Sequence, residues 1–167
     1  MFLDFPPAIN LFNLLEDKGG VMKLRHKIGF GLYLLDTIMA IATGFAYFFS
    51  GKVMPYHAQV IGKDWAEVDR GIQIIFLSLM QNYGAAVIAY MFLSLVVLFI
   101  PFRQGERWAN WTLFLVNIVV FAGLTFFVNF KTYLATNVLN PWPLLLAGIV
   151  MGVLAFLLSI GMEKEKK

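Results

Sequence analysis

Residues 72–100 form an apolar stretch without a single charged side chain. A helix of this length, rising about 1.5 Å per residue, is longer than the roughly 30 Å hydrocarbon core of a bilayer. A chain that crosses this core must satisfy its own backbone hydrogen bonds, and a helix does so. The stretch therefore predicts a transmembrane helix, and Pro101 marks its end because proline disrupts a continuing helix.

Three further apolar stretches are long enough to cross a bilayer, at about residues 28–50, 111–129 and 144–162. The composition agrees, since 60% of the residues are apolar and 14% are charged. Soluble domains have about 45–50% apolar and about 25% charged residues. The sequence predicts an all-α polytopic membrane protein, a four-helix transmembrane bundle over residues 28–162.

The flanks of the bundle are polar. Residues 1–27 have a weak helical period that predicts a short amphipathic helix on the membrane surface, and a frayed tail is the alternative. The segment lacks a basic start before its apolar residues, so a signal peptide is not expected. Met22 offers an alternative start of the chain. Residues 163–167 form a charged tail.

Positive charge is unevenly distributed between the two ends of the predicted crossings. Nine Lys and Arg residues lie in the N-terminal flank, the turn after Pro101 and the tail, against four at the other ends. Cytoplasmic flanks carry the excess of Lys and Arg. Both termini are therefore predicted in the cytoplasm, and residues 51–71 form an outer loop.

Asp36 is the only charged residue in the first predicted crossing. A carboxylate at this depth is costly and normally faces the bundle interior with a partner. Counting from the helix ends brings a polar residue of every other crossing near its level. These candidates are Gln81, Asn82, Tyr83, Asn117 and Ser159. The cluster is either a pocket for protons or a ligand's polar end, or a hydrogen-bonded group that joins the helices.

Small residues recur at four-residue spacing in three of the predicted crossings. They let membrane helices approach closely, either within one chain or between subunits. The spaced residues are Gly148 and Gly152 with Ala155 beyond them, Ala40 with Gly44, and Ala85 with Ala89.

The outer loop contains Tyr56, His57 and Trp65. The sequence from Asp64 to Glu67 resembles a capping box, which predicts that the second helix begins near Trp65. One histidine among scattered carboxylates is a weak metal pattern, so we predict no metal site.

Other cofactors and partners are disfavoured by composition. The chain has no cysteine, which excludes iron–sulfur clusters and thiolate metal sites, and no intramembrane histidine to bind haem. No basic face points to nucleic acid. The cofactor, if there is one, stays undetermined.

A resemblance rests on three short motifs. The motifs are residues 54–57 (Met-Pro-Tyr-His), Trp65 and residues 103–108 (Arg-Gln-Gly-Glu-Arg-Trp). With them, the chain resembles small bacterial four-helix membrane proteins without an assigned function, from the outer loop through the third crossing. The resemblance implies a fold and no activity.

The leading functional expectation is a non-enzymatic accessory or structural subunit of a larger membrane complex. It rests on small-residue packing faces and on the lack of a catalytic motif, and the expected partners are the lipid bilayer and other membrane subunits or further copies. The alternative is a binder or enzyme for a small apolar molecule (a lipid, sterol or quinone) that uses a pocket around Asp36. A small transporter is a third reading, disfavoured because no crossing is broken and no repeat is found.

Overall fold

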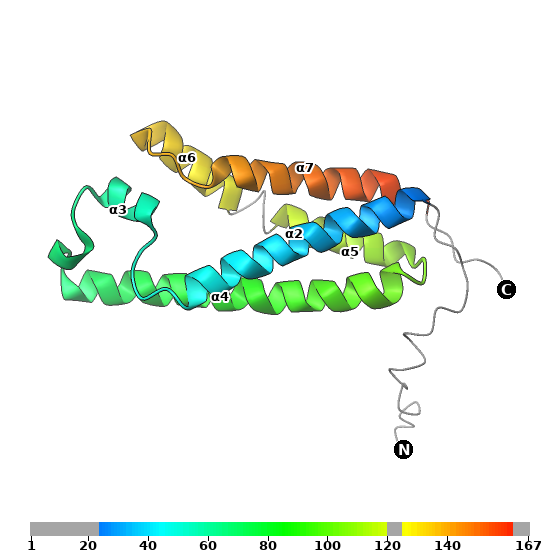
Figure 1. The fold of residues 1–167 in the computed structure, drawn as a ribbon, viewed down its shortest axis with the longest axis horizontal. Coiled ribbons are helices and arrows are strands. Elements are labelled where there is room, and N and C mark those ends of the chain that lie inside the picture. The colour runs from blue at the N-terminus through cyan, green and yellow to red at the C-terminus, as the bar shows by residue number, and fades with distance from the viewer. Residues whose placement is uncertain (1–23, 120–124, 162–167) are drawn as a thin grey trace, which may run out of the picture.

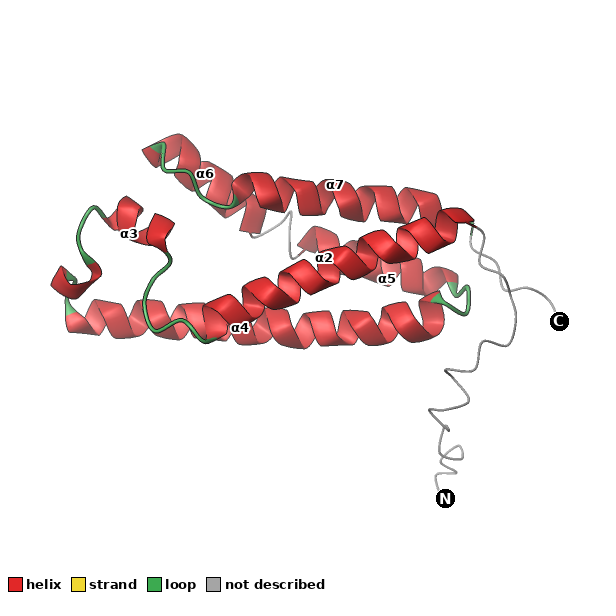
Figure 2. Cartoon of the chain, in the orientation of Figure 1, coloured by secondary structure: helices red, strands yellow, loops and turns green. Residues whose placement is uncertain are grey.

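A computed structural model describes residues 24–119 and 125–161, and every regular element within them is helical (Figure 1, Figure 2). Three helices are long and apolar enough to cross a membrane: α2 (Leu24–Phe48), α4 (Arg70–Val97) with the turn that follows it, and α7 (Trp142–Ser159). These helices indicate an integral membrane protein. The predicted surface helix and the charged tail lie outside the described residues.

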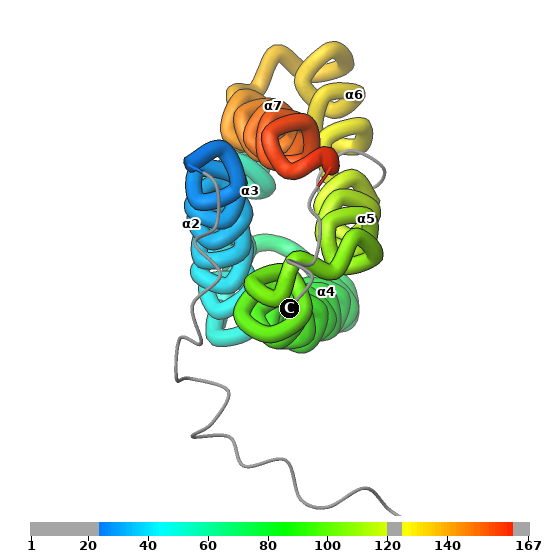
Figure 3. The backbone as a smooth tube through the Cα atoms, turned by 90° about the vertical axis from the view of Figure 1, so that its right-hand side faces the viewer, coloured from blue at the N-terminus to red at the C-terminus, as the bar shows by residue number. Residues whose placement is uncertain are grey.

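Helix α2 lies between the other two long helices and packs against both α4 and α7. A shorter helix, α5 (Arg107–Asn117), packs against α7 and α4 on the opposite side, as the view along the helices shows (Figure 3). Helices α2 and α4 approach each other closely at Gly44 and Gly84. A β-carbon placed on Gly84 would lie 2.6 Å from the carbonyl oxygen of Gly44, so only glycine allows this approach.

The buried interior of the bundle consists of two apolar clusters. One surrounds Tyr33 and Phe102 near the start of α2, and we call this the η2 end after the turn described below. The other surrounds Ala40 and Met91 toward the end of α2, and we call this the α3 end after the short helix found there. Large apolar side chains such as Leu79 are exposed on the outer helix faces, as expected of surfaces that contact lipid.

Helix α4 begins later than the capping box predicted. Asp69 is its N-cap, and its side chain accepts hydrogen bonds from the backbone N–H of Gly71 at 2.8 Å and of Ile72 at 3.3 Å. Asp64 makes no capping bond and precedes a separate 3₁₀ turn, η1 (Trp65–Glu67). The prediction was wrong because Val68 is extended (ψ 138°) and separates the two elements.

The end of α4 follows the prediction closely but has an unexpected form. The helix continues into a π-helical turn, η2 (Leu98–Phe102), which contains Pro101. Wider π turns occur where the regular hydrogen-bond ladder is interrupted, and proline lacks the N–H that the ladder needs. Gly105, with φ 76°, then reverses the chain toward α5.

The stretch predicted as the third crossing is not one regular helix. Helix α5 has 11 residues, fewer than the roughly 17 that a spanning helix needs. Residues 118–119 and 125–126 are π-helical, and α6 (Phe127–Thr136) follows. Residues 120–124 lie outside the described part of the chain. A short helix that the sequence did not predict, α3 (Pro55–Ile61), lies between α2 and η1.

Candidate functional site

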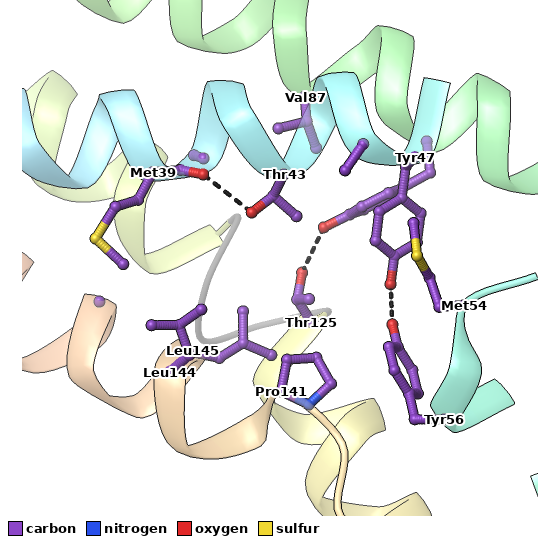
Figure 4. Close-up of a pocket in the computed structure, with 14 residues that line it drawn as sticks. Met39, Thr43, Tyr47, Met54, Tyr56, Val87, Thr125, Pro141, Leu144 and Leu145 are labelled. Carbon is purple, nitrogen blue, oxygen red and sulfur yellow. Dashed lines mark hydrogen bonds between the residues drawn. The ribbon is translucent and has the colours of Figure 1, made fainter. Parts of the chain in front are cut away.

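A cavity of about 200 Å³ lies at the α3 end, between α2, α4 and α7 (Figure 4). We call it the tyrosine pocket. Its lining residues are Met39, Ala40, Thr43, Ala46, Tyr47, Met54, Tyr56, Tyr83, Val87, Thr125, Pro141, Leu144, Leu145 and Gly148. Most of these side chains are apolar and none carries a charge. A mostly apolar cavity with a few polar groups is the usual form of a small-molecule site.

The polar atoms of the pocket are hydroxyl groups arranged in pairs. The hydroxyls of Tyr47 and Tyr56 are hydrogen bonded to each other, and those of Tyr83 and Thr125 are 3.0 Å apart. Thr43 donates to the carbonyl oxygen of Met39, four residues back along α2, at 2.9 Å. Most side-chain oxygens on the lining are thus hydrogen bonded to a neighbouring group. Because these oxygens belong to hydroxyl groups, the wall is polar in places but uncharged.

Helix α3 contains Tyr56 and His57, two of the residues that the sequence analysis assigned to the outer loop. The His57 ring packs edge-on against Tyr56, with centroids 4.1 Å apart, and its Nδ1 is buried without a hydrogen-bond partner in the described chain. Burial lowers the pKa of His57 and raises the pKa of Tyr56. Both groups are therefore uncharged at neutral pH, like the rest of the lining.

Asp36 lies one helical turn from the pocket. It precedes Ala40, a lining residue, by four positions on α2, and Gly152 follows the lining residue Gly148 by four positions on α7. One turn rises about 5.4 Å, and neither Asp36 nor Gly152 is among the lining residues. The polar candidates and the cavity are adjacent but separate.

The structure brings two of the polar candidates together. Asp36 is fully buried, and a β-carbon on Gly152 would lie 3.7 Å from its Oδ2 and 3.7 Å from the side-chain amide nitrogen of Asn117. Neither carboxyl oxygen of Asp36 has a hydrogen-bond partner among the described residues. Asp36 and Asn117 therefore border one small space beside Gly152 without bonding each other.

The other polar candidates lie elsewhere. Gln81 and Asn82 are exposed on α4, and Tyr83 faces the tyrosine pocket. Ser159 is buried at the η2 end, where a β-carbon on Gly29 would collide with its hydroxyl. A single cluster around Asp36 was thus a wrong prediction. Its cause is the stagger of the helices, because α4 extends past the α3 end of α2 and shifts the levels that counting had aligned (Figure 1).

The predicted small residues have different roles. Gly44 contacts α4, whereas Ala40 and Gly148 line the pocket. Gly152 lies beside Asp36, and Ala155 is buried near the η2 end.

Two of the predicted small residues, Ala85 and Ala89, do not lie in a contact between helices of the described chain. Ala85 and Ala89 are exposed, so they make no helix contact within the described chain, and their predicted role in a contact between subunits stays a prediction. Gly84, the residue before Ala85, takes the contact position instead.

Trp65 and the acidic residues of the outer loop lie outside the pocket lining. The carbonyl oxygen of Trp65 accepts a hydrogen bond from the Gln73 side chain at 2.6 Å, which ties η1 to α4. In the described part of the chain, no three His, Asp or Glu side chains come close enough to share a metal ion.

Sequence reasoning missed several residues of the site. Met39, Thr43 and Thr125 were not singled out, Met54 was named only as part of the motif at residues 54–57, and Tyr47 carried only the general signal of an aromatic residue near a helix end. Their signal is weak because each of these residue types is common in membrane helices. The buried hydrogen bond from Tyr33 to the Asn110 side chain, 3.0 Å long, was also missed.

Similarity to known proteins gives no lead to the ligand. No protein-family model, curated protein or solved structure matches the chain. Function must therefore be inferred from the pocket itself.

Proposed function

We propose that this protein binds a small, uncharged, largely apolar molecule in the tyrosine pocket, without catalysing its conversion. One observation carries the proposal, namely a cavity of about 200 Å³ with apolar walls, paired hydroxyls and no charge. Phospholipid headgroups are charged and would lose their hydration here without a compensating ion pair. A neutral molecule that dissolves in the bilayer has no such cost.

Binding is favoured over catalysis by the chemistry of the lining. Covalent catalysis needs a nucleophile activated by a base, and general acid–base catalysis needs a group whose pKa is near the working pH. The described lining residues include no carboxylate, lysine or histidine. Asp36 lies one helical turn from the lining residue Ala40 and does not itself line the pocket.

We also propose that α5 and α6 belong to a fourth crossing that completes a four-helix bundle. Its support is the packing of α5 against α4 and α7 and of α6 against α7. The distribution of Lys and Arg favours cytoplasmic termini. The proposal of a bacterial inner membrane rests on the resemblance to small bacterial membrane proteins. In this orientation α3 and the pocket lie at the outer side.

A second candidate function is assembly with another membrane subunit or another copy of the chain. The observation that favours it is the exposure of Ala85 and Ala89 on α4, which leaves a small-residue face without a neighbour in the described chain. This role is compatible with ligand binding. Gentle detergent purification separates the two roles, because a stoichiometric protein partner indicates assembly and a retained small molecule indicates binding.

The binding proposal is tested by extracting the purified full chain and identifying what it retains. Ala46→Leu adds bulk to a residue that lines the pocket, and Ala42→Leu is the matched control at an exposed position of the same helix outside the lining. Native mass spectrometry should find a small neutral molecule on the parent and on Ala42→Leu, and much less on Ala46→Leu. Equal retention by all three proteins would disprove the proposal.

A further inference from the structure

The two hydroxyl groups of the Tyr47–Tyr56 pair have one more hydrogen than their mutual hydrogen bond requires. Each tyrosine hydroxyl has one hydrogen to donate. Because the two hydroxyls bond to each other, one hydrogen is shared between them and the other is left over. No described residue accepts this second hydrogen, although both side chains line the cavity. The pair therefore has one unused donor at the wall of the pocket.

The surroundings of the pair favour an uncharged ligand group. Burial raises the pKa of Tyr56, so its hydroxyl keeps its proton at neutral pH. Burial lowers the pKa of His57, whose ring packs against Tyr56, so no imidazolium adds a positive charge. An unused donor in an uncharged apolar site is satisfied best by a neutral acceptor.

The walls near the pair are aromatic. The rings of Tyr47 and Tyr83 have centroids 5.4 Å apart with planes at 63°, and both border the cavity. The two methionines of the lining, Met39 and Met54, add polarizable thioethers, which make favourable contacts with aromatic rings. This wall suits a flat ring whose edge carries the acceptor.

We infer that the ligand carries a carbonyl oxygen at its polar end, as a ketone or quinone does, and that the Tyr47–Tyr56 pair donates a hydrogen bond to that oxygen. The inference rests on the proposed function and adds the chemistry of recognition. Either tyrosine alone still has a hydrogen for the ligand, because loss of one hydroxyl also removes the internal bond. Only removal of both hydroxyls abolishes recognition of the oxygen.

Two probes with the same carbon skeleton test the inference on the full chain in nanodiscs. 2-Methyl-1,4-naphthoquinone has two carbonyl oxygens, and 2-methylnaphthalene has none. The chain contains no cysteine, so the quinone meets no thiol on the protein. Affinities are measured by ligand-observed NMR against empty nanodiscs, which corrects for partition of each probe into lipid.

The parent protein should bind the quinone about three- to tenfold more tightly than the hydrocarbon, the range of one net hydrogen bond. The double variant Tyr47→Phe/Tyr56→Phe should lose this preference. Tyr90→Phe is the matched control, because Tyr90 is 58% exposed and lies outside the lining, and it should keep the preference.

The remaining outcomes separate this inference from the proposed function. If both probes bind the parent equally and Ala46→Leu weakens both, the pocket binds apolar molecules and the carbonyl inference is wrong. If neither probe binds above the empty nanodisc, or Ala46→Leu changes neither, both proposals are wrong. Where the double variant fails to fold, equal binding of the two probes by the parent still refutes the carbonyl inference.

Discussion

The close approach of α2 and α4 at Gly84 makes Gly84→Ala the most informative single change. A β-carbon on Gly84 would lie 2.6 Å from the carbonyl oxygen of Gly44 and 2.6 Å from the backbone nitrogen of Phe48. Ordinary van der Waals contact begins at 3.4 Å. Both colliding atoms belong to the backbone of α2, so no side-chain rotation relieves the clash, and α2 and α4 must move apart.

The expected cost follows from the overlap. Forcing an extra methyl group into a packed interface costs about 1–3 kcal/mol when the backbone has to shift. Alanine offsets part of this cost because its intrinsic helix propensity exceeds that of glycine by about 1 kcal/mol. We expect a net loss of up to about 2 kcal/mol in the free energy of unfolding. Since Tyr83 and Val87 flank Gly84 and line the pocket, ligand retention should fall as well.

Unfolding titrations in mild detergent measure this loss, and Gly31→Ala is the matched control on α2. A β-carbon on Gly31 meets nothing within 4 Å, so this variant should be as stable as the parent or slightly more stable. If Gly84→Ala unfolds like Gly31→Ala, the two helices do not approach at Gly84 and the packing described here is wrong.

Three further predictions concern groups outside this contact. Asp36→Leu should leave the free energy of unfolding unchanged or raise it, because a buried polar group without a partner costs about 1–3 kcal/mol. A clear loss of stability in a thermal melt would contradict the absence of a hydrogen-bond partner for Asp36. Cysteines introduced at Gln59 and Gln104 should differ in intact cells, with an impermeant thiol reagent labelling only the first; the reverse would overturn the orientation. Because burial lowers the folded-state pKa of His57 below its ordinary 6.5, the unfolded chain binds more protons as the pH falls through that value. The α3 helix should therefore lose amide-exchange protection between pH 7 and pH 5 in the parent and not in His57→Gln, and equal loss in both would exclude His57 as the cause.

The sequence predicts the long helices well because hydrophobic length is a local property. The stretch at residues 72–100 was expected to cross the membrane, and α4 with η2 covers it from Arg70 to Phe102. The stretch at residues 28–50 corresponds to α2, which ends at Phe48. Nothing in the same pattern reveals α3, because seven residues are too few for a helical period to show.

The site was harder to predict because it depends on how the helices are staggered. Asp36 and Asn117 were correctly placed near each other, since both lie deep within their helices. Gln81 was predicted at the level of Asp36 on the assumption that all helices begin in one plane at the α3 end of the bundle. Helix α4 begins well beyond that plane (Figure 1). Gly84 and Ala85 are adjacent small residues, and only the rotation of α4 decides which of them faces α2.

The most direct test of the tyrosine pocket is to map where a small molecule crosslinks in living membranes. Cells grown with photo-methionine place a photoreactive group of nearly native shape at Met39 and Met54, which line the pocket, and at Met91, which is fully buried and outside the lining. Irradiation followed by peptide mass spectrometry should find one neutral small-molecule adduct on the Met39 and Met54 peptides, none on the Met91 peptide, and none in the Ala46→Leu protein. Phospholipid adducts alone at Met39 and Met54, or the same adducts in Ala46→Leu, would contradict a ligand in this pocket.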